Sequence, residues 1–487
     1  MAEQNVIDLN GIVTNIGGRF MFAISIVGIF LALVKREEKK RMYIKYALLL
    51  TVWYIGTIYA STKGVRWVLL LVPAFSIAFG VFAGVVVQYL SKIVARELNV
   101  NIVFSKIALV IVLGLLFVVP SQSALYPKAV STAKNEIPSM NDAWVNSLEK
   151  IKINSSEDAI INSWWDFGHW FKYWADRAVT FDGTSQTGDR AHFIGRVLLT
   201  PDEEEAINII RMLDCSGFEA VDTLQKKTND SLGSVLSIIE ATQSDRSRAT
   251  QLLREEYGTE TAKLVIDAMY CEPPEDFFIA SEDMVGKSGV WAHFGSWNFT
   301  RASMVNKVRP IKNAQKGGKI LVDEFGLSEE LANQYYYEIQ TQEANNWIAP
   351  WPSYSSAPAG CQVNGMIISC GNGLILNMTS GEAYADTPQG RIYPMSFSCI
   401  DPFGMFRFVE YDSEFLAEHN SQPFGVAFFP EGDGYNSVLM TPELPGSMFT
   451  RMFYYKGYGL KYFKPFDYTR DISGLDIYVY KIDWEGS

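Results

Sequence analysis

The stretch VRWVLLLVPAFSIAFGVFAGVVVQYL, residues 65–90, decides the fold class of this 487-residue chain. It contains no acidic residue, and its single cation, Arg66, stands near its beginning. At about 1.5 Å per helical residue, such a run is long enough to cross the roughly 30 Å hydrocarbon layer of a bilayer. The stretch therefore predicts a membrane-spanning helix.

Three further apolar runs without acidic residues predict spans at 11–34, 43–60 and 103–120. Arg19 and Arg66 stand near the starts of their runs, and from the residues alone both snorkelling to the membrane surface and a functional role stay open. After Pro120 the chain has the turns, charges and amphipathic patterns of a globular protein. We therefore expect a membrane α-helical anchor of four spans over residues 1–120 and an appended α+β region.

Basic residues tend to stay on the cytoplasmic side of a membrane, and here they concentrate in the first and third connections between the spans. They are Lys35, Arg36, Lys39, Lys40, Arg41 and Lys45, then Lys92 and Arg96. With four spans, Met1 and the whole region after Pro120 are predicted to be extracytoplasmic. That side is the cell exterior in a prokaryote and the lumen of the secretory pathway in a eukaryote.

The globular region divides into two parts that differ in their pattern of apolar residues. Residues 121–316 predict a mostly α central core, in which a short strand, Ala159-Ile160-Ile161, leads into two tryptophans. Residues 317–487 begin with one more helix near Ser328–Ile339. Alternating apolar runs separated by Gly, Asn and Pro then predict a small β-rich C-terminal domain.

Composition excludes some classes of function. The net charge is −12, and no basic stripe occurs outside the expected cytoplasmic loops, which argues against nucleic-acid binding. The five cysteines lack paired CxxC spacing, so a zinc site is not expected, and Cys361 with Cys370 is the candidate pair for one external disulfide. Four Asn-x-Ser/Thr sequons occur about as often as chance predicts and carry no functional weight; they begin at Asn154, Asn229, Asn298 and Asn377.

The segment Trp164-Trp165-Asp166-Phe167-Gly168 is the strongest functional signal. A carboxylate and indole N–H groups in a pocket can hydrogen-bond a hydroxyl. A ligand without that hydroxyl would leave polar groups unpaired, at a cost of about 1–3 kcal/mol. Taken without its context, an aromatic core patch with a capping Asp is the alternative interpretation.

The segment resembles the WWDYG signature of the catalytic subunit of N-linked oligosaccharyltransferase, with Phe in place of Tyr. The segments around it are similar to the family too, with Ala143-Trp144 before it and Phe181-Asp182-Gly183 after it. Two C-terminal segments also look like the family, Ser447-Met448-Phe449-Thr450-Arg451 and Tyr478-Val479-Tyr480-Lys481. The resemblance implies an archaeal-like glycosyltransferase for protein N-glycosylation. It implies that Trp164, Trp165 and Asp166 bind the Ser or Thr of an acceptor sequon.

A second family element, an Asp and a Lys on a short helix, resembles Asp283-Met284-Val285-Gly286-Lys287. Here three residues separate Asp283 from Lys287, whereas the family often has two. The resemblance implies that both side chains belong to the acceptor-binding pocket. The alternative from the residues is a helix N-terminal Asp followed by an unrelated solvated Lys.

The family's membrane site holds Mn²⁺ or Mg²⁺ and the diphosphate of a lipid-linked oligosaccharide of the dolichyl diphosphate type. Ala2-Glu3-Gln4 looks like the tail of an external loop motif, which makes Glu3 a candidate catalytic and metal-binding residue; an ordinary exposed Glu is the alternative. Gly64-Val65-Arg66-Trp67 is similar to the family's late-span segment, and it implies that Arg66 faces the lipid diphosphate.

The family has around thirteen spans, and this chain matches only the last four and the external region. We therefore expect the C-terminal portion of the enzyme, inactive in transfer without an upstream half or a companion subunit. The expected partners are lipid-linked oligosaccharide, polypeptides with Asn-x-Ser/Thr, and the bilayer. The alternative is a truncated, catalytically inactive membrane protein that binds sequons or docks to an intact enzyme.

Overall fold

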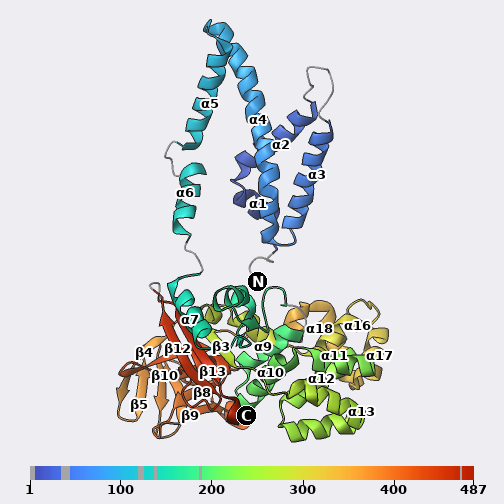
Figure 1. Ribbon diagram of the computed structural model, residues 1–487, viewed down its shortest axis with the longest axis vertical. Coiled ribbons are helices and arrows are strands. Elements are labelled where there is room, and N and C mark those ends of the chain that lie inside the picture. The colour runs from blue at the N-terminus through green and yellow to red at the C-terminus, as the bar shows by residue number, and fades with distance from the viewer. Residues whose placement is uncertain are drawn as a thin grey trace. The chain divides into compact units, whose positions relative to one another are not determined.

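The computed structural model describes residues 6–34, 44–118, 125–136, 140–185, 189–471 and 474–486. The chain forms two compact units, Met1–Ser139 and Met140–Ser487, which we call the helical unit and the globular unit (Figure 1). The three-part division at residues 120 and 316 remains a prediction. Its second boundary falls within a helix, α17 (Ala314–Phe325).

The helical unit contains no strand among its described residues. Its elements are α1 (Leu9–Asn15), α2 (Arg19–Val34), α3 (Ile44–Ser61), η2 (Val65–Trp67), α4 (Val68–Glu97), α5 (Ile102–Val118) and α6 (Leu125–Asn135). Its core includes Ile12 of α1, Leu50 and Tyr54 of α3 and Leu71 of α4, and Phe22 and Ile29 of α2 pack against it. The apolar faces of α1 to α4 therefore pack together.

Within the described part of the chain, one helix, Val65–Glu97, is long and apolar enough to cross a membrane. The pair α1 and α2 adds a second span if the two count as one. The other two predicted runs, 43–60 and 103–120, form the helices α3 and α5. The apolar helix α5 is shorter, and the last two residues of its predicted run, Val119 and Pro120, lie outside the described residues. The four predicted spans are therefore not confirmed.

The expectation of one continuous helix over 11–34 was wrong. The structure bends by 91° between Leu9–Asn15 and Arg19–Leu33. Gly17 and Gly18 lie between them with φ values of 106° and 91°, a backbone region outside the right-handed helix that glycine adopts without a steric penalty. Two consecutive glycines thus end one helix and start another within a run that contains no acidic residue.

The globular unit is built on a five-stranded sheet of order β12-β13-β3-β1-β2. The strands are β1 (Ile160–Asn162), β2 (Ala178–Val179), β3 (Asp276–Ser281), β12 (Phe463–Arg470) and β13 (Asp476–Ile482). The first three run parallel to each other, while β13 is antiparallel to both β3 and β12. Figure 1 shows the red C-terminal strands beside β3.

This sheet corrects the expected organisation in one respect. The short strand expected in the mostly α central region is present as β1, but the last two strands of the expected β-rich domain, β12 and β13, belong to the same sheet as β1. Every residue of β3 is buried, and Phe277 and Phe278 are fully enclosed, so this strand forms the centre of the fold. Strands from both ends of the globular unit are therefore required to form this one core.

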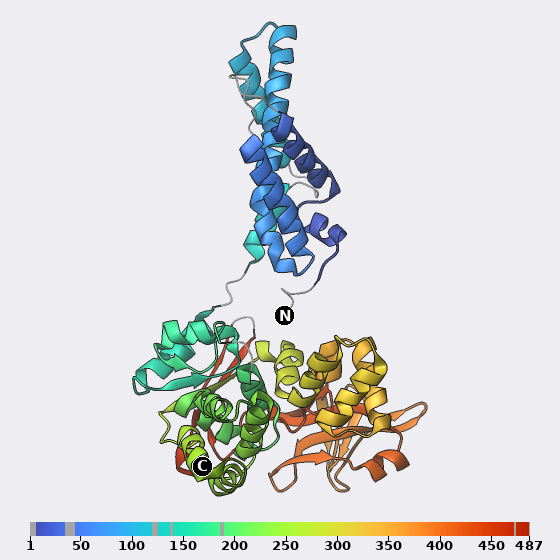
Figure 2. The same ribbon diagram turned by 90° about the vertical axis from the view of Figure 1, so that its right-hand side faces the viewer.

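Helices cover this sheet and extend beyond it. They are α7 (Asp142–Ile153), α8 (Gly168–Trp170), η4 (Phe171–Ala175), α9 (Asp189–Leu199), α10 (Glu203–Ser216), α11 (Glu219–Thr228), α12 (Ser231–Thr242), α13 (Arg246–Met269), α14 (Asp283–Gly286), α15 (Ser288–Gly295), α16 (Phe299–Val308), α17, α18 (Glu329–Thr341), α19 (Ala344–Ile348) and α21 (Met448–Phe453). Figures 1 and 2 both show the green helices of 203–269 set apart from the orange strands.

The orange strands form an eight-stranded sheet of order β10-β11-β4-β5-β6-β7-β8-β9. They are β4 (Ala359–Asn364), β5 (Ile367–Cys370), β6 (Leu374–Asn377), β7 (Glu382–Thr387), β8 (Gly390–Ile400), β9 (Phe406–Glu410), β10 (Ser421–Glu431) and β11 (Gly434–Met440), with α20 (Ser413–Glu418) after β9. An additional pairing of β10 with β8 closes the sheet on itself around a separate apolar core. The predicted β-rich C-terminal region is confirmed here.

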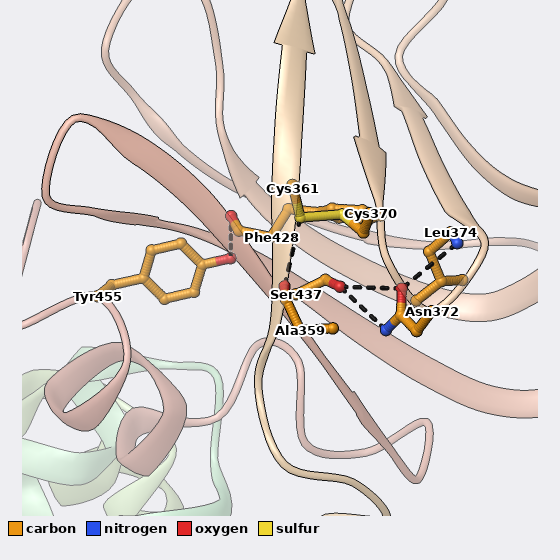
Figure 3. Close-up of a disulfide and its surroundings, with 8 residues drawn as sticks. All are labelled: Ala359, Cys361, Cys370, Asn372, Leu374, Phe428, Ser437 and Tyr455. Atoms are coloured by element: carbon orange, nitrogen blue, oxygen red, sulfur yellow. Dashed lines mark hydrogen bonds between the residues drawn. A yellow bond between two sulfur atoms is a disulfide. The ribbon is translucent and has the colours of Figure 1, made fainter.

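Two disulfides stabilise the globular unit. Cys361 and Cys370 lie opposite each other on β4 and β5, as predicted, and Figure 3 shows the bridge beside Asn372, whose side chain bonds Ser437. A second bridge joins Cys215 to Cys271 across 56 residues. The sequence did not predict this pair, because no short spacing connects its members.

Candidate functional site

The two motifs singled out in the sequence meet at one edge of the five-stranded sheet. β1 and β3 are parallel neighbours, with Asn162 opposite Phe278, so their carboxyl ends point the same way. The segment 163–168 leaves β1 at that edge, and Glu282 and α14 leave β3 there. The ends of adjacent parallel strands are a common place for ligand binding, because loops from different strands converge on it.

Asp166, Asp283 and Lys287 form a cluster at this edge. The Lys287 Nζ lies 2.8 Å from a carboxylate oxygen of Asp283 and 3.4 Å from one of Asp166. The three side chains are 24%, 23% and 33% exposed, so solvent or a ligand can reach them. Two carboxylates share one ammonium, which leaves the Asp166–Asp283–Lys287 cluster one negative charge in excess and rich in hydrogen-bond acceptors.

Neighbouring groups hold this cluster in place. The Ser281 hydroxyl donates to Asp283 at 2.5 Å, and the Lys287 ammonium lies 4.7 Å from the centroid of the Phe167 ring. An ammonium at this distance is attracted to the aromatic ring. Although three residues separate Asp283 from Lys287, the short helix expected from the sequence is present, and it places the Lys287 ammonium within reach of both Asp283 and Asp166.

The tryptophans differ in exposure. Trp164 is 3% exposed and packs edge-on against Phe181, while Trp165 is partly exposed and packs against the same core. Trp291 is fully buried and donates from its indole nitrogen to the Met284 carbonyl at 2.8 Å. The aromatic residues therefore fix the backbone on both sides of the cluster, and Trp165 is the accessible one of the Trp164-Trp165 pair.

The sequence did not predict a structural role for Asp182, which entered the sequence comparison only as part of the segment Phe181-Asp182-Gly183 that follows the motif. Its carboxylate is 2% exposed and accepts hydrogen bonds from the backbone nitrogens of Thr184 and Ser185 and from the Lys172 ammonium. Burial alone would raise the pKa of Asp182, but the bonds from Lys172 and Thr184 outweigh it and hold the pKa below its ordinary value.

This carboxylate ties the loop after β2 to Lys172 of η4, and the loop itself packs against the motif. Gly168 lies so close to the loop that a Cβ on it would come within 2.6 Å of the Asp182 Cβ and 2.7 Å of the Phe181 carbonyl oxygen. Only a residue without a side chain allows this approach. The glycine of the motif therefore serves packing, whereas its aspartate serves the accessible cluster.

Below the motif, Asn162 bridges two buried carboxyl groups. Its side-chain nitrogen donates to Asp214 at 2.8 Å and to Asp276 at 3.0 Å. Burial raises the pKa of Asp214 to about 8, and burial together with the charge of Asp214 raises the pKa of Asp276 well above its ordinary range. At neutral pH these groups are therefore held at least partly protonated.

The other predicted site residues lie elsewhere. Arg66 belongs to the helical unit, where it is exposed at the start of α4 with its guanidinium 5.0 Å from the Trp67 ring, and Glu3 lies outside the described residues. Across the described ranges, no group of three or more His, Cys, Asp or Glu side chains could hold a metal ion. The expected Mn²⁺ or Mg²⁺ stays a prediction, because Glu3, its candidate ligand, is not among the described residues.

Comparison with known proteins identifies relatives of this chain. Residues 156–282 match the STT3/PglB/AglB core domain, which includes Trp164, Trp165 and Asp166 and ends one residue before Asp283. The "Dolichyl-phosphooligosaccharide-protein glycotransferase" of Methanocaldococcus jannaschii is 28% identical, over 96% of this chain and 54% of the relative. The protein of the same description from Methanococcus voltae is 27% identical, over 61% and 41% respectively. The chain spans about half the length of the curated relatives it matches.

Among solved structures, an Archaeoglobus fulgidus oligosaccharyltransferase tethered to an acceptor peptide containing the NVT sequon is 11% identical. The alignment covers 92% of this chain and 37% of that one, with a TM-score of 0.39, which is too low to support an argument about shared geometry. The sequence matches, by contrast, confirm the resemblance to the oligosaccharyltransferase catalytic subunit.

Proposed function

We propose that this chain, a relative of archaeal oligosaccharyltransferases with an STT3/PglB/AglB core domain at residues 156–282, is the acceptor-binding portion of such an enzyme. In the complete reaction a glycan passes from a lipid-linked, dolichyl diphosphate type donor to the side-chain nitrogen of Asn in Asn-x-Ser/Thr. The Asp166–Asp283–Lys287 cluster is the observation that supports this proposal.

The cluster binds the hydroxyl of the sequon. The two partly exposed carboxylates offer acceptor oxygens for its O–H. The Lys287 ammonium pairs with both carboxylates and offsets part of their negative charge. A peptide with Ala in place of Thr would leave a carboxylate oxygen without its partner. That loss costs about 1–3 kcal/mol, which is roughly ten- to hundredfold in affinity.

The transfer step requires chemical groups that the cluster does not provide. The lone pair of an amide nitrogen is delocalised into its carbonyl, with a rotation barrier of about 18–20 kcal/mol, so the amide needs activation before it attacks a sugar. In this proposal Arg66 and Glu3 belong to the donor side, with Arg66 pairing with the lipid diphosphate. Transfer therefore requires an upstream half or a companion subunit.

The location outside the cytoplasm is part of the proposal. Disulfides persist in oxidising compartments, and the globular unit has two of them, Cys215–Cys271 and Cys361–Cys370. The apolar helix Val65–Glu97 supports attachment to a bilayer. The second candidate function, a binding module without transfer activity, uses the same cluster and differs only in lacking a catalytic partner.

Peptide binding by the globular unit, residues 140–487, tests the proposal. We expect a fluorescent peptide with Asn-Ala-Thr to bind roughly ten- to hundredfold more tightly than its Asn-Ala-Ala counterpart. The preference should disappear in Asp166→Ala. It should remain in the control Asp386→Ala, which removes an exposed carboxylate paired with Arg391. Equal binding of both peptides by the wild type would refute the assigned acceptor site.

A further inference from the structure

The chain carries four Asn-x-Ser/Thr sequons, and the structure separates them by local conformation, not by exposure: Asn154, Asn229 and Asn298 are exposed and Asn377 is partly exposed. Sequons in an extracytoplasmic protein are potential acceptors for N-glycosylation. Modification requires that a transferase reach both the side-chain nitrogen of Asn and the hydroxyl two residues later. In a folded protein, exposed loop tips meet this requirement better than helices do, because the chain there protrudes and opens locally at low cost.

Asn377 is the last residue of β6, paired with Glu382 of β7, and its sequon continues into the turn of the β6–β7 hairpin. Its side-chain oxygen accepts hydrogen bonds from the backbone nitrogens of Thr379 at 2.9 Å and Ser380 at 3.2 Å. Gly381, with a φ of 73°, closes the turn by donating to the Asn377 carbonyl at 2.8 Å. Thr379 and Ser380 are exposed and Asn377 is partly exposed.

This geometry leaves the reactive groups available. Because the oxygen of the Asn377 side chain is bound to the turn, its nitrogen is directed away from the Thr379 backbone. Among the described residues, neither that nitrogen nor the Thr379 hydroxyl makes a hydrogen bond. The sequon is therefore presented as an ordered, solvent-facing turn.

The other three sequons are held in helix ends. The Asn154 side-chain nitrogen donates to the Lys150 carbonyl, and the hydroxyl of its sequon, on Ser156, donates to Glu275. Asn298 caps α16, with its next two residues inside that helix. Asn229 is the left-handed end of α11, and the last residue of its sequon starts α12.

We propose that Asn377 is an N-glycosylation site, so that this chain is an acceptor as well as a binder of acceptors. The bond between the anomeric carbon of a lipid-linked oligosaccharide and its diphosphate oxygen breaks, and that carbon forms a bond to the Asn377 nitrogen. The lipid diphosphate leaves with the electron pair, and the amide proton passes to a base of the transferase. The inference rests on the proposed external location of the globular unit.

Mass spectrometry of the full chain, purified from an N-glycosylating archaeal host, tests this. We expect the peptide containing Asn377 to carry a glycan in the wild type and in Thr379→Ser. Thr379→Ala should lose it, although the backbone N–H that holds the turn is retained. Thr300→Ala, which removes the Asn298 sequon, should leave the glycan on Asn377 unchanged.

The same measurement reports the location of the globular unit through its disulfides. An unmodified Asn377 in a chain with an intact Cys361–Cys370 bridge would overturn the inference while leaving the proposed function standing. An unmodified Asn377 with reduced cysteines would overturn the inference and the external location together. Modification at Asn154, Asn229 or Asn298 in preference to Asn377 would also overturn the argument from local conformation.

Discussion

Replacing Asp182 by Asn should destabilise the globular unit, because this carboxylate orders the loop after β2 and connects it to Lys172 of η4. It is 2% exposed, and one of its oxygens accepts from the Thr184 nitrogen at 2.8 Å, the Thr184 hydroxyl at 2.6 Å and the Ser185 nitrogen at 3.2 Å. The other oxygen accepts from Lys172. Asn keeps the shape and one acceptor but removes the charge.

The magnitude follows from those contacts. Hydrogen bonds to a charged group contribute about 1.5–3 kcal/mol, against roughly 0.5–1.5 for neutral ones, so the loop bonds together lose about 1–2 kcal/mol. The amide of Asn would also face the Lys172 ammonium donor to donor. Because the Lys172 side chain is 49% exposed and can turn to solvent, this adds only about 1 kcal/mol. We expect a total loss near 2–3 kcal/mol.

Urea unfolding of residues 140–487, followed by tryptophan fluorescence, measures this loss. The pKa of Asp182 is lowered on folding, so its stabilisation is present above its ordinary pKa of about 4 and is lost as pH falls below that. The difference between wild type and Asp182→Asn should therefore be full at pH 7 and smaller at pH 3. A loss no larger than that of the exposed Asp386→Asn, or one unchanged at pH 3, would refute the reasoning.

Three further changes test other parts of the fold. Gly168→Ala should lower stability by about 1–3 kcal/mol in thermal melts, because the new Cβ would meet Asp182, and an unchanged Tm would contradict the close packing. Folding raises the pKa of Asp214 to about 8, so its contribution to stability is full below about pH 4 and is lost as pH rises through 8. Asp214→Asn should therefore gain stability relative to the wild type between pH 5 and 8.5. A difference in stability that does not change with pH would count against the buried pair. Replacing Cys215 and Cys271 by Ser opens a 56-residue loop and should cost about 4 kcal/mol in urea unfolding, whereas no loss would show that the bridge does not constrain the unfolded chain.

The sequence predicted the local features well because they depend on neighbouring residues. The apolar run 65–90, the short helix carrying Asp283 and the hairpin disulfide Cys361–Cys370 are all set by composition or short spacing. The break at Gly17 and Gly18 was missed, although two adjacent glycines were visible. Uniform hydropathy over 11–34 concealed a change in backbone direction that only the φ values reveal.

Long-range features could not be predicted in the same way. β13 pairs with β3 across almost two hundred residues, and nothing in the alternating pattern of 476–482 distinguishes this partner from the nearer orange strands. Asp182 also looked like an ordinary turn residue. Its burial beneath the motif depends on parallel pairing of β1 with β2, which brings the following loop against Gly168.

The central claim is that the Asp166–Asp283–Lys287 cluster receives the hydroxyl-bearing residue of a sequon. Photo-crosslinking tests it most directly, with an Asn-Ala-Thr peptide that carries a diazirine on the residue after Thr and with an Asn-Ala-Ala control. We predict crosslinks within 164–168 and 283–291 for the Thr peptide, lost with the control peptide and in Asp166→Ala. Crosslinks of equal yield from both peptides, or crosslinks confined to segments away from these two, would contradict the claim.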